Sequence, residues 1–585
     1  MRAQKKILLG LFSLCALNIN GAEYKEGTYI GKANGYKGDI KVEVQLTKNK
    51  IKNISVISNG DTPIISDAPI RIIPKKILEI QGLGIDSVAG ATGTSKGIIR
   101  AVSNAIKIGK GNIKDLRKIK EVKKEFSNKI IKHENDVVVI GAGGAGLIAA
   151  IEAKNNGANV VVIEKMEFPG GNTLISGGEY AAPENWIQNQ KGLSDSKETF
   201  YKDIIKGGDN ESDIKLAKVL AENALNGALW LRDSINVTFE NRQMFFGGHS
   251  VERSLVPEGA SGVELIKKLM KKAQELGIEV HLGTNGIELI RENNRVIGVK
   301  AKTETALHEY IAKNGVIIAS GGFGSNLEMR KKYNSKMDEK ILSTNTKGIT
   351  GDGIILGENI GADTVDMEYI QTYPVCDPVN GSLLYTGDVR LAGSAILVNK
   401  EGKRFVEELE RRDVISFAIT EQTDGVGYLV WDQKQLDDTG VKKHHKEEYE
   451  GLIKRGILVK VNTLDEGAKH FNIDAKELKN SVEKYNGYTK TGKDLEFEKR
   501  GGLITLETPP YYILKVAPAI HHTMGGLVID EKARVLDKKG KVIKGLYAAG
   551  EVTGDIHGKN RLGSNAIADI TVFGRIAGKN IVLEK

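Results

Sequence analysis

The stretch that decides the fold of this 585-residue chain is Val137-Val138-Val139-Ile140-Gly141-Ala142-Gly143-Gly144-Ala145-Gly146. Four β-branched residues run into a glycine turn, and an alanine-rich segment opens a helix directly after it, as in dinucleotide-binding βαβ units. In that fingerprint Gly141 permits the tight turn, Gly143 lets a pyrophosphate approach the backbone, and Gly146 lets helix and strand pack closely. We therefore expect a strand over 137–140, a helix over 144–156 and a second strand over 159–164.

Segments downstream of this unit favour FAD as the dinucleotide. Glu164 ends the second strand, where a carboxylate binds the adenosine ribose. The runs Gly170-Gly171-Asn172-Thr173 and Ser176-Gly177-Gly178 resemble the loop along the flavin in the fumarate reductase and succinate dehydrogenase superfamily. This resemblance covers about residues 135–585 and is nearest to the soluble, periplasmic flavocytochrome-type fumarate reductases. It implies a non-covalent FAD with these contacts: Gly141, Gly143, Ala145, Gly146, Glu164, Asn172, Thr173, Gly177, Gly178, Asp352, Glu551, Ala566 and Ile567.

A second flavin motif lies near the N-terminus. Asp86-Ser87-Val88-Ala89-Gly90-Ala91-Thr92 resembles the motif on which a flavin transferase esterifies FMN to a threonine, although that family usually carries Ser or Thr in place of Ala89. The phosphoester link needs a hydroxyl, so Thr92 is the expected acceptor, with Thr94 and Ser95 as alternatives. Two flavins on one polypeptide indicate an electron relay from covalent FMN to FAD.

The fold class that we predict is a multidomain α/β protein, because the chain is too long for a single core. Alternating apolar residues over 40–46 and 51–57 predict hairpin strands, and helices are expected around 74–81 and 95–108. The predicted order is a signal peptide (1–22), a small α+β FMN-binding domain (23–108), a linker (109–134), a Rossmann-like FAD domain (135–371 and 506–585) and an inserted α+β capping domain (372–505).

Composition excludes several classes of protein. The two cysteines, Cys15 and Cys376, form no Cys-x-x-Cys-His run and no cluster, which excludes c-type haem and iron–sulfur centres. We predict no metal site. The net charge of +9 comes with no nucleic-acid-binding motif, and the lysine-rich run over 107–132 is either a solvated surface or a docking patch for an acidic electron donor.

The N-terminal residues 1–22 have the pattern of a secretory signal peptide. A basic start is followed by a short apolar run over 7–17 and by Asn20-Gly21-Ala22, a small-residue cleavage region. We expect a periplasmic or otherwise exported protein, with the signal either removed or kept as an anchor.

Three further segments resemble the active-site motifs of the superfamily. The run over 401–413 resembles the segment with the catalytic arginine, which its register places at Arg412, with Arg411 as the alternative. His521 and Arg561 match a substrate-binding histidine and a carboxylate-clamping arginine. Hydride addition to an alkene conjugated to a carboxylate builds negative charge on that carboxylate, which a guanidinium can bind bidentately.

The far end of the substrate pocket departs from the fumarate reductases. A Gln-x-His-Pro run becomes Gln371-Thr372-Tyr373-Pro374, and a Thr-Glu pair becomes Thr386-Gly387, followed by Asp388. A carboxylate here should repel a second substrate carboxylate and attract a cation or an N–H donor. The Tyr373 and Asp388 pattern resembles urocanate-reducing members of the superfamily, with Glu179 and Phe246 as further substrate contacts. Either Asp388 also serves the proton relay to Arg412 or protons arrive by another route.

We therefore predict an oxidoreductase acting on CH–CH groups that reduces urocanate. The alternatives are fumarate or another enoate, such as acrylate, methacrylate or a cinnamate, and an electron carrier without substrate chemistry. The expected partners are the enoate, a flavin transferase and an electron donor, either a membrane quinol-oxidising cytochrome or a flavoprotein.

Overall fold

The computed structural model describes residues 23–122, 125–392 and 395–584, so the predicted signal peptide lies outside the described residues. The molecule separates into two compact units. Among the described residues, one unit holds 23–61 together with Pro69–Val122, and the other holds Thr62–Ala68 and the described residues from 125 onwards. In the described part of the sequence, no helix combines the length and apolarity needed to cross a membrane.

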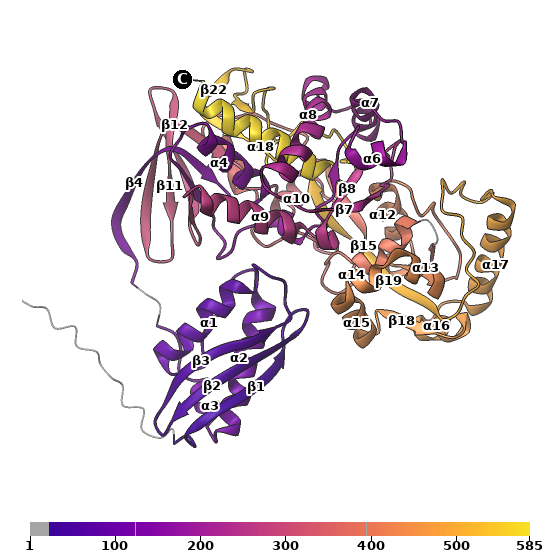
Figure 1. Cartoon of the computed structure of the whole chain (residues 1–585), viewed down its shortest axis with the longest axis horizontal. Helices are drawn as coiled ribbons and strands as arrows, with labels where there is room; N and C mark the ends of the chain where they lie inside the picture. The colour runs from indigo at the N-terminus through magenta and orange to yellow at the C-terminus, as the bar shows by residue number, and fades with distance from the viewer. Residues whose placement is uncertain (1–22, 123–124, 393–394, 585) are drawn as a thin grey trace, which may run out of the picture. The chain divides into compact units, whose positions relative to one another are not determined.

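The N-terminal unit is an antiparallel sheet of order β1-β2-β3 with helices packed on it (Figure 1). Its elements are β1 (Gly27–Asn34), β2 (Asp39–Thr47), β3 (Lys50–Asn59), α1 (Asp67–Ile80), α2 (Thr92–Ile108) and α3 (Ile113–Leu116). Helix α2 packs on β1 and β2, where Val42, Val44, Ile98 and Val102 are fully buried. The predicted hairpins are confirmed. Both predicted helices begin earlier than expected, and α1 continues through Pro74 instead of starting there.

The second unit is built on an eight-stranded sheet of order β10-β11-β22-β12-β4-β5-β9, with β21 paired to β22. Strands β12, β4, β5 and β9 run parallel, as expected for a Rossmann-like domain. The strands are β4 (Ser127–Ile140), β5 (Val160–Ile163), β9 (Glu279–His281), β10 (Asn285–Glu292), β11 (Arg295–Lys302), β12 (Ala306–Ile318), β21 (Arg534–Leu536) and β22 (Val542–Ala548). The predicted α/β multidomain class is confirmed.

Strand β4 is longer than the sequence pattern indicated. It begins at Ser127, ten residues before the apolar run, and its first half pairs with β12 through the register Ile131 to His308. These early residues form the outer strand of an extension in which β12 also pairs with β11, and they are mostly exposed. They therefore lack the apolar pattern that marks a buried strand. The segment 109–134 therefore contains α3 and the start of β4.

Helices cover the sheet of the FAD domain. Helix α4 packs against α18 and α9, and its first turn faces the glycine loop after β4. The helices and smaller strands here are α4 (Gly144–Asn155), α5 (Gly171–Ile175), β6 (Tyr180–Ala181), α6 (Trp186–Lys191), α7 (Lys197–Gly207), α8 (Ile214–Asp233), β7 (Phe239–Met244), β8 (Ser254–Pro257), α9 (Gly262–Glu275), α10 (Leu327–Tyr333), α11 (Asp352–Glu358), β14 (Thr364–Val365), β20 (Gly526–Leu527) and α18 (Asn565–Leu583).

The capping region is a second mixed layer, centred on β19 (Tyr511–Thr523), which pairs with β13, β15, β17 and β18. Its elements are β13 (Leu342–Ser343), β15 (Ile370–Cys376), η2 (Tyr385–Ala392), β16 (Ile396–Val398), α12 (Arg412–Thr420), β17 (Gly427–Asp432), α13 (Gln433–Thr439), α14 (Val441–His444), α15 (Lys446–Arg455), β18 (Leu458–Val461), α16 (Leu464–Phe471) and α17 (Ala475–Thr491). Tyr512 to Val516 of β19 belong to the same apolar core as β17. The boundary at 505/506 stays a prediction, because β19 serves both regions.

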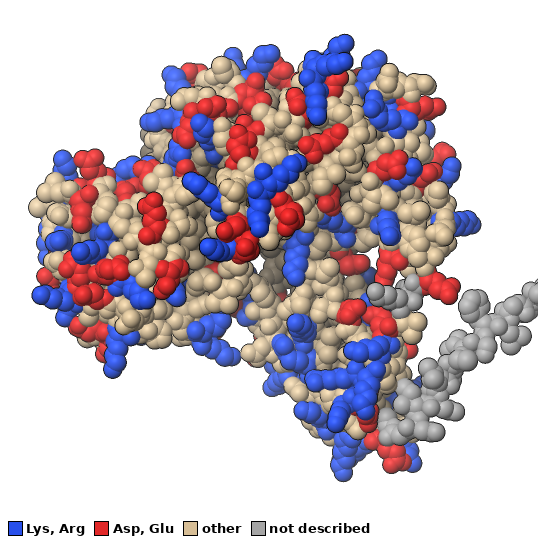
Figure 2. All heavy atoms as spheres, turned by 180° about the vertical axis from the view of Figure 1, so that it is seen from behind, with Lys and Arg blue, Asp and Glu red and all other residues tan. Residues whose placement is uncertain are grey.

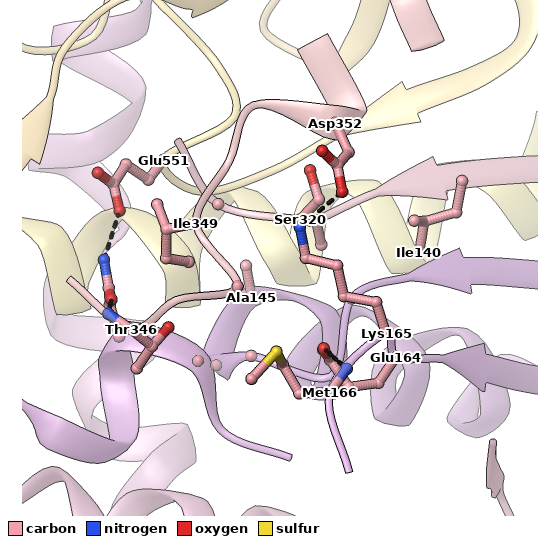
Figure 3. A pocket seen from close by; sticks show the side chains of 18 of the residues that line it. Ile140, Ala145, Glu164, Lys165, Met166, Ser320, Thr346, Ile349, Asp352 and Glu551 are labelled. Carbon is pink, nitrogen blue, oxygen red and sulfur yellow. Dashed lines mark hydrogen bonds and ion pairs between the residues drawn. The ribbon is translucent and has the colours of Figure 1, made fainter. Parts of the chain in front are cut away.

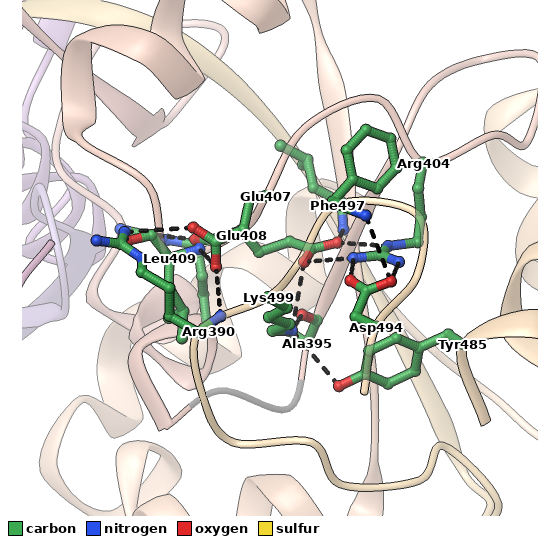
Figure 4. Close-up of polar contacts among 12 residues, drawn as sticks. Arg390, Ala395, Arg404, Glu407, Glu408, Leu409, Tyr485, Asp494, Phe497 and Lys499 are labelled. Atoms are coloured by element: carbon green, nitrogen blue, oxygen red, sulfur yellow. Dashed lines mark hydrogen bonds and ion pairs between the residues drawn. The ribbon is translucent and has the colours of Figure 1, made fainter. Parts of the chain in front are cut away.

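A buried ionic network fixes the backbone just before Arg412 (Figure 4). The Arg404 guanidinium donates to both oxygens of Glu408 and of Asp494, and Lys499 lies 3.4 Å from the Glu408 carboxylate. Arg390 Nη1 donates to the Glu408 carbonyl oxygen at 2.8 Å. Removing one partner would leave a buried charge uncompensated, which is costly, so the network holds η2 and the 404–412 segment in one arrangement.

Candidate active site

The glycines of the fingerprint differ in their backbone angles and in the space around them. Gly141 has φ of +107°, and a Cβ there would lie 2.4 Å from the Ala319 carbonyl oxygen; a Cβ on Gly146 would lie 1.9 Å from the Gly141 carbonyl oxygen. A Cβ on Gly143 meets nothing within 4 Å, so this position faces open space. No side chain caps the N-terminus of α4, and its first N–H groups are free for a phosphate.

Polar side chains at the ends of β5 and α11 line the same hollow (Figure 3). The Glu164 carboxylate accepts from the Ala142 and Met166 N–H groups at 2.9 and 2.8 Å. Burial raises the pKa of Glu164. Lys165 Nζ lies 2.5 Å from Asp352 Oδ2 and also donates to Thr350. We did not predict Lys165; its place beside Glu164 at a strand end was the one signal in the sequence.

The hollow fits the predicted dinucleotide. Its empty volume is about 800 Å³, within the usual range for ligand pockets. An adjoining pocket of about 580 Å³ shares Asn172, Thr173 and Glu551 with it. Predicted cofactor residues that line one or both pockets are Gly141, Gly143, Ala145, Glu164, Asn172, Thr173, Asp352, Glu551, Ala566 and Ile567. Gly146, Gly177 and Gly178 line neither pocket, and a Cβ on Gly178 would press on Leu265 and Pro257.

The adjoining pocket brings His521 and Arg561 together. His521 Nδ1 lies 3.0 Å from the Thr344 hydroxyl. Burial, with Arg561 and Arg412 nearby, lowers the pKa of His521 well below its usual value, so the imidazole is neutral. Burial, followed by the charge of Arg412, lowers the pKa of Arg561 to about 9. A bound carboxylate would relieve this repulsion.

The two candidate catalytic arginines differ in their surroundings. Arg411 is held at the surface by Asp209 and Asp413, at 2.5 and 2.6 Å. Arg412 begins α12, and its guanidinium lies over the rings of Tyr373 and Phe246, 4.8 and 5.3 Å from their centroids. Among the described residues, Arg412 forms no ion pair, and burial lowers its pKa. Only Arg412 is therefore free to meet a substrate.

Two carboxylates, those of Asp388 and Glu179, also lie close enough to Arg412 to interact with its charge. The Tyr373 hydroxyl donates to Asp388 Oδ1 at 3.2 Å, and the Tyr373 ring lies 5.2 Å from that of His521. Burial first, and then the charge of Glu179, raises the pKa of Asp388 to about 7. Burial likewise raises the pKa of Glu179, which interacts with Arg412 and Arg561. In the described residues no ion pair joins Asp388 to Arg390, although the charge of Arg390 acts to lower the pKa of Asp388.

Three supporting contacts had no signal in the sequence. Thr344 orients His521, and the Gln371 amide donates to Asn560 Oδ1 and to the Arg561 carbonyl oxygen, which fixes the clamp loop. Glu448 of α15 accepts from the Thr386 N–H and hydroxyl, at 2.7 and 2.8 Å, and so holds the segment that bears Asp388. Thr344 and Glu448 belong to no motif, and the run that begins at Gln371 gave no indication of its contact with the Arg561 loop.

The candidate FMN attachment site is the first residue of α2. The Thr94 hydroxyl is buried and donates to Asp61 at 2.7 Å, and the Ser95 hydroxyl is buried and donates to the Ala91 carbonyl oxygen at 2.9 Å. Thr92 is partly exposed, and its hydroxyl makes no hydrogen bond within the described residues. Of the three hydroxyls, that of Thr92 is the accessible one.

Two family models match this protein. An FAD binding domain matches residues 136–567, and an FMN-binding domain matches residues 35–107. The chain therefore belongs to the FAD-dependent fumarate reductase and succinate dehydrogenase superfamily, with an FMN-binding domain on its N-terminal side. It is a flavin-dependent oxidoreductase acting on CH–CH groups, as the sequence predicted.

Comparison with individual proteins identifies relatives that reduce C=C bonds. The protein is 45% identical to a urocanate reductase of Eggerthella lenta over 557 residues, which cover 94% of this chain and 91% of the relative. It is 36% identical to an NADH:acrylate oxidoreductase of Vibrio harveyi over 95% of its own length, but only 61% of that relative. The open conformation of a flavocytochrome c3 fumarate reductase matches with a TM-score of 0.67 and 35% identity, covering 80% of this chain and 83% of that one.

Proposed function

We propose that this protein reduces the C=C bond in the propenoate arm of urocanate to give imidazole propionate. The observation that carries this proposal is the Tyr373–Asp388 pair, whose hydroxyl and carboxylate lie 3.2 Å apart beside Arg412. The N–H group of the urocanate imidazole, or its imidazolium form, can bind the Asp388 carboxylate. The single carboxylate of urocanate can bind the arginines. The identity to a urocanate reductase supports the same substrate.

The arginines and the neutral histidine bind the carboxylate end of the substrate. Arg561 offers a planar pair of N–H donors. Burial first, and then the charge of Arg412, lowers its pKa, and a bound anion would offset the repulsion from Arg412. A neutral His521, held by Thr344, donates or accepts one hydrogen bond without adding charge. These groups stabilise the negative charge that grows on the carboxylate as the alkene is reduced.

Arg412 holds the proton for the alkene carbon. Reduction adds two electrons and two protons to the C=C bond; bound FAD supplies one hydride, which leaves one proton for the protein. Burial lowers the pKa of Arg412, which makes its guanidinium a stronger acid than in water. The aromatic rings of Tyr373 and Phe246 exclude water from one side of it.

The alternative is reduction of fumarate or another enoate. A second carboxylate in the position of the imidazole would face Asp388 and Glu179 and meet like-charge repulsion. A substrate such as acrylate has no polar group at the end opposite its carboxylate, so it would leave Asp388 without a partner. The electrostatics of the pocket therefore favour urocanate among these substrates.

We also propose that FMN is esterified to Thr92 by a flavin transferase and passes electrons to FAD, in a protein exported beyond the cytoplasmic membrane. Thr92→Ala should abolish the mass increment of FMN on the purified protein, whereas Thr92→Ser should retain it. Retention of the increment in Thr92→Ala would move the assignment to Thr94 or Ser95.

The test of the substrate uses the purified, FMN-loaded protein with a reduced viologen dye. Oxidation of the dye is followed after adding urocanate or fumarate at equal concentrations, and imidazole propionate is identified by mass. We expect fast oxidation with urocanate and almost none with fumarate. The reverse order would show that the far pocket accepts a carboxylate and would refute the proposal.

A further inference from the structure

The positive charge of this protein is concentrated in one unit. Residues 23–122 contain 18 Lys and Arg against 10 Asp and Glu, whereas residues 123–585 contain 63 against 65. Lys and Arg predominate on the face of the N-terminal unit seen in Figure 2, while both signs are interspersed over the larger unit. The net charge of +9 therefore describes the FMN-binding domain and the first 22 residues and not the domain that performs the reduction.

Within the N-terminal unit, five cationic side chains line one groove. It lies between the second half of α2, the end of β1 and α3, with about 1130 Å³ of empty volume. The cationic residues on its walls are Arg100, Lys107, Lys114, Arg117 and Lys118. All five are exposed, so their charges reach the solvent.

Most of these charges have no internal partner. Only Lys118 forms an ion pair, with Asp115 at 2.8 Å; in the described residues the other four groove cations form none. Arg100 instead donates to the Asn34 carbonyl oxygen at 2.6 Å, and Asn104 donates to the Lys32 carbonyl oxygen at 2.9 Å. These contacts tie α2 to β1 and keep the groove wall rigid, so its cations project from a fixed frame.

We propose that this groove is the docking surface for an electron-donor protein with an acidic surface. A concave surface suits the convex acidic face of a protein better than the plane of an anionic membrane, and its field would steer such a partner into contact. The groove begins at Arg100, eight residues along α2 from Thr92, which is about 12 Å at the α-helical rise. A partner seated there lies beside the flavin site without covering it. This inference rests on the proposed role of FMN as the entry point for electrons.

The electron balance requires a reductant. Each turnover removes two electrons from the donor, which is oxidised, and takes two protons from water, while the C=C bond becomes a single bond. An acidic donor protein seated in the groove would supply these electrons to the FMN-binding domain.

The test measures flavin reduction in the FMN-loaded, full-length protein without substrate, so that its outcome does not depend on which enoate is reduced. The probe is dithionite-reduced flavodoxin, a small acidic redox protein, mixed with the enzyme by stopped flow. The triple variant Lys107→Glu, Lys114→Glu, Arg117→Glu reverses the groove. The matched control, Lys25→Glu, Lys50→Glu, Lys52→Glu, makes the same charge change at exposed lysines outside the groove.

We expect groove reversal to slow reduction by flavodoxin at least about tenfold at low ionic strength, with the control much closer to wild type and the difference vanishing in high salt. Reduction by a viologen dye should be equal in all three proteins, which shows that FMN and fold are intact. Equal flavodoxin rates in the two variants would overturn the proposal. A second result would also overturn the proposal: the groove variant alone loses binding to vesicles that contain phosphatidylglycerol, while its rate of reduction by flavodoxin is unchanged. That result would assign the groove to lipid binding.

Discussion

The two ends of the substrate pocket are held in place in different ways. At the carboxylate end, Arg412, Arg561 and His521 come from three recognisable motifs, and two of the three side chains are cations that form no ion pair in the described residues. At the far end, Tyr373, Asp388 and Glu179 bring a hydroxyl and two carboxylates together, and burial raises the pKa of both acids. We propose that the first group of residues carries out the reduction and that the second selects the substrate.

This difference has an electrostatic consequence. In the binding mode that we propose, the residues around the substrate change from cationic at its carboxylate to anionic at its imidazole. A molecule with an anion at one end and an N–H donor or cation at the other matches both ends, whereas a dicarboxylate matches one and opposes the other. The variants below change one end of the pocket at a time, and the rates with urocanate and fumarate show what that end contributes.

The largest effect is expected from the carboxylate end. Arg412→Ala should lower kcat with urocanate by about 10²–10⁴-fold, because the proton donor is lost, while FAD absorbance is retained. The control, Arg411→Ala, removes a surface ion pair with Asp209 and Asp413 and should change kcat by less than about fivefold. A greater loss in Arg411→Ala than in Arg412→Ala would reverse the assignment.

The second effect concerns the far end. Asp388→Asn should lower kcat/KM for urocanate by about 10²-fold, because the imidazole loses a charged acceptor, and should raise kcat/KM for fumarate. Competition between the two substrates in one assay gives the ratio directly. Asp438→Asn, an exposed carboxylate on α13, is the control and should leave the ratio unchanged. An unchanged ratio in Asp388→Asn would mean that the far end does not select the substrate.

The pH dependence of kcat/KM for urocanate also tests the role of Asp388. Asp388 has a pKa of about 7, so its carboxyl is protonated below this pH and cannot balance a cationic or N–H partner. The kcat/KM for urocanate should therefore fall as pH drops through about 7, beyond any effect of the substrate's own titration. The titration of urocanate itself affects the wild-type protein and the Asp388→Asn variant equally. The ratio of their two pH profiles of kcat/KM therefore reports the titration of Asp388 alone. Glu179→Gln should move the fall to lower pH, since the charge of Glu179 raises the pKa of Asp388; a ratio that is flat with pH would contradict the assignment.

The smallest effect is expected at Tyr373. Tyr373→Phe keeps the ring over which Arg412 lies and removes only the hydrogen bond to Asp388. The loss of one such bond to a charged group corresponds to about tenfold in kcat/KM for urocanate, with kcat for fumarate little changed. Steady-state kinetics with both substrates would decide, and a large loss with both would show that Tyr373 supports Arg412 instead of the substrate's far end.

The sequence predicted the elements whose function is encoded locally. The fingerprint around Gly141 needs particular backbone angles and close approaches, and those requirements appear as glycines at fixed spacing. Arg412 was placed by the register of a contiguous motif, and its neighbour Arg411 was separable only once Asp209, 202 residues away, was seen to bind it.

Contacts between distant segments could not be predicted in this way. Thr344 orients His521, and Glu448 holds the backbone of Thr386, yet neither lies in a pattern that differs from ordinary loops and helix starts. The early half of β4 was missed for a related reason. An exposed strand needs only a hydrogen-bonding partner, here β12, and leaves no apolar periodicity in its own residues.

The eight residues of η2, Tyr385–Ala392, lie outside the glycine loops and the arginine motifs, yet they carry Asp388 and, through Tyr385, reach the Ile175 carbonyl oxygen at 2.7 Å. A substitution within this one turn would therefore change the carboxylate that faces the substrate, provided that Arg390 is kept, because Arg390 also donates to the Glu408 carbonyl oxygen ahead of Arg412. For protein engineering, η2 is thus a place to alter substrate choice with few substitutions.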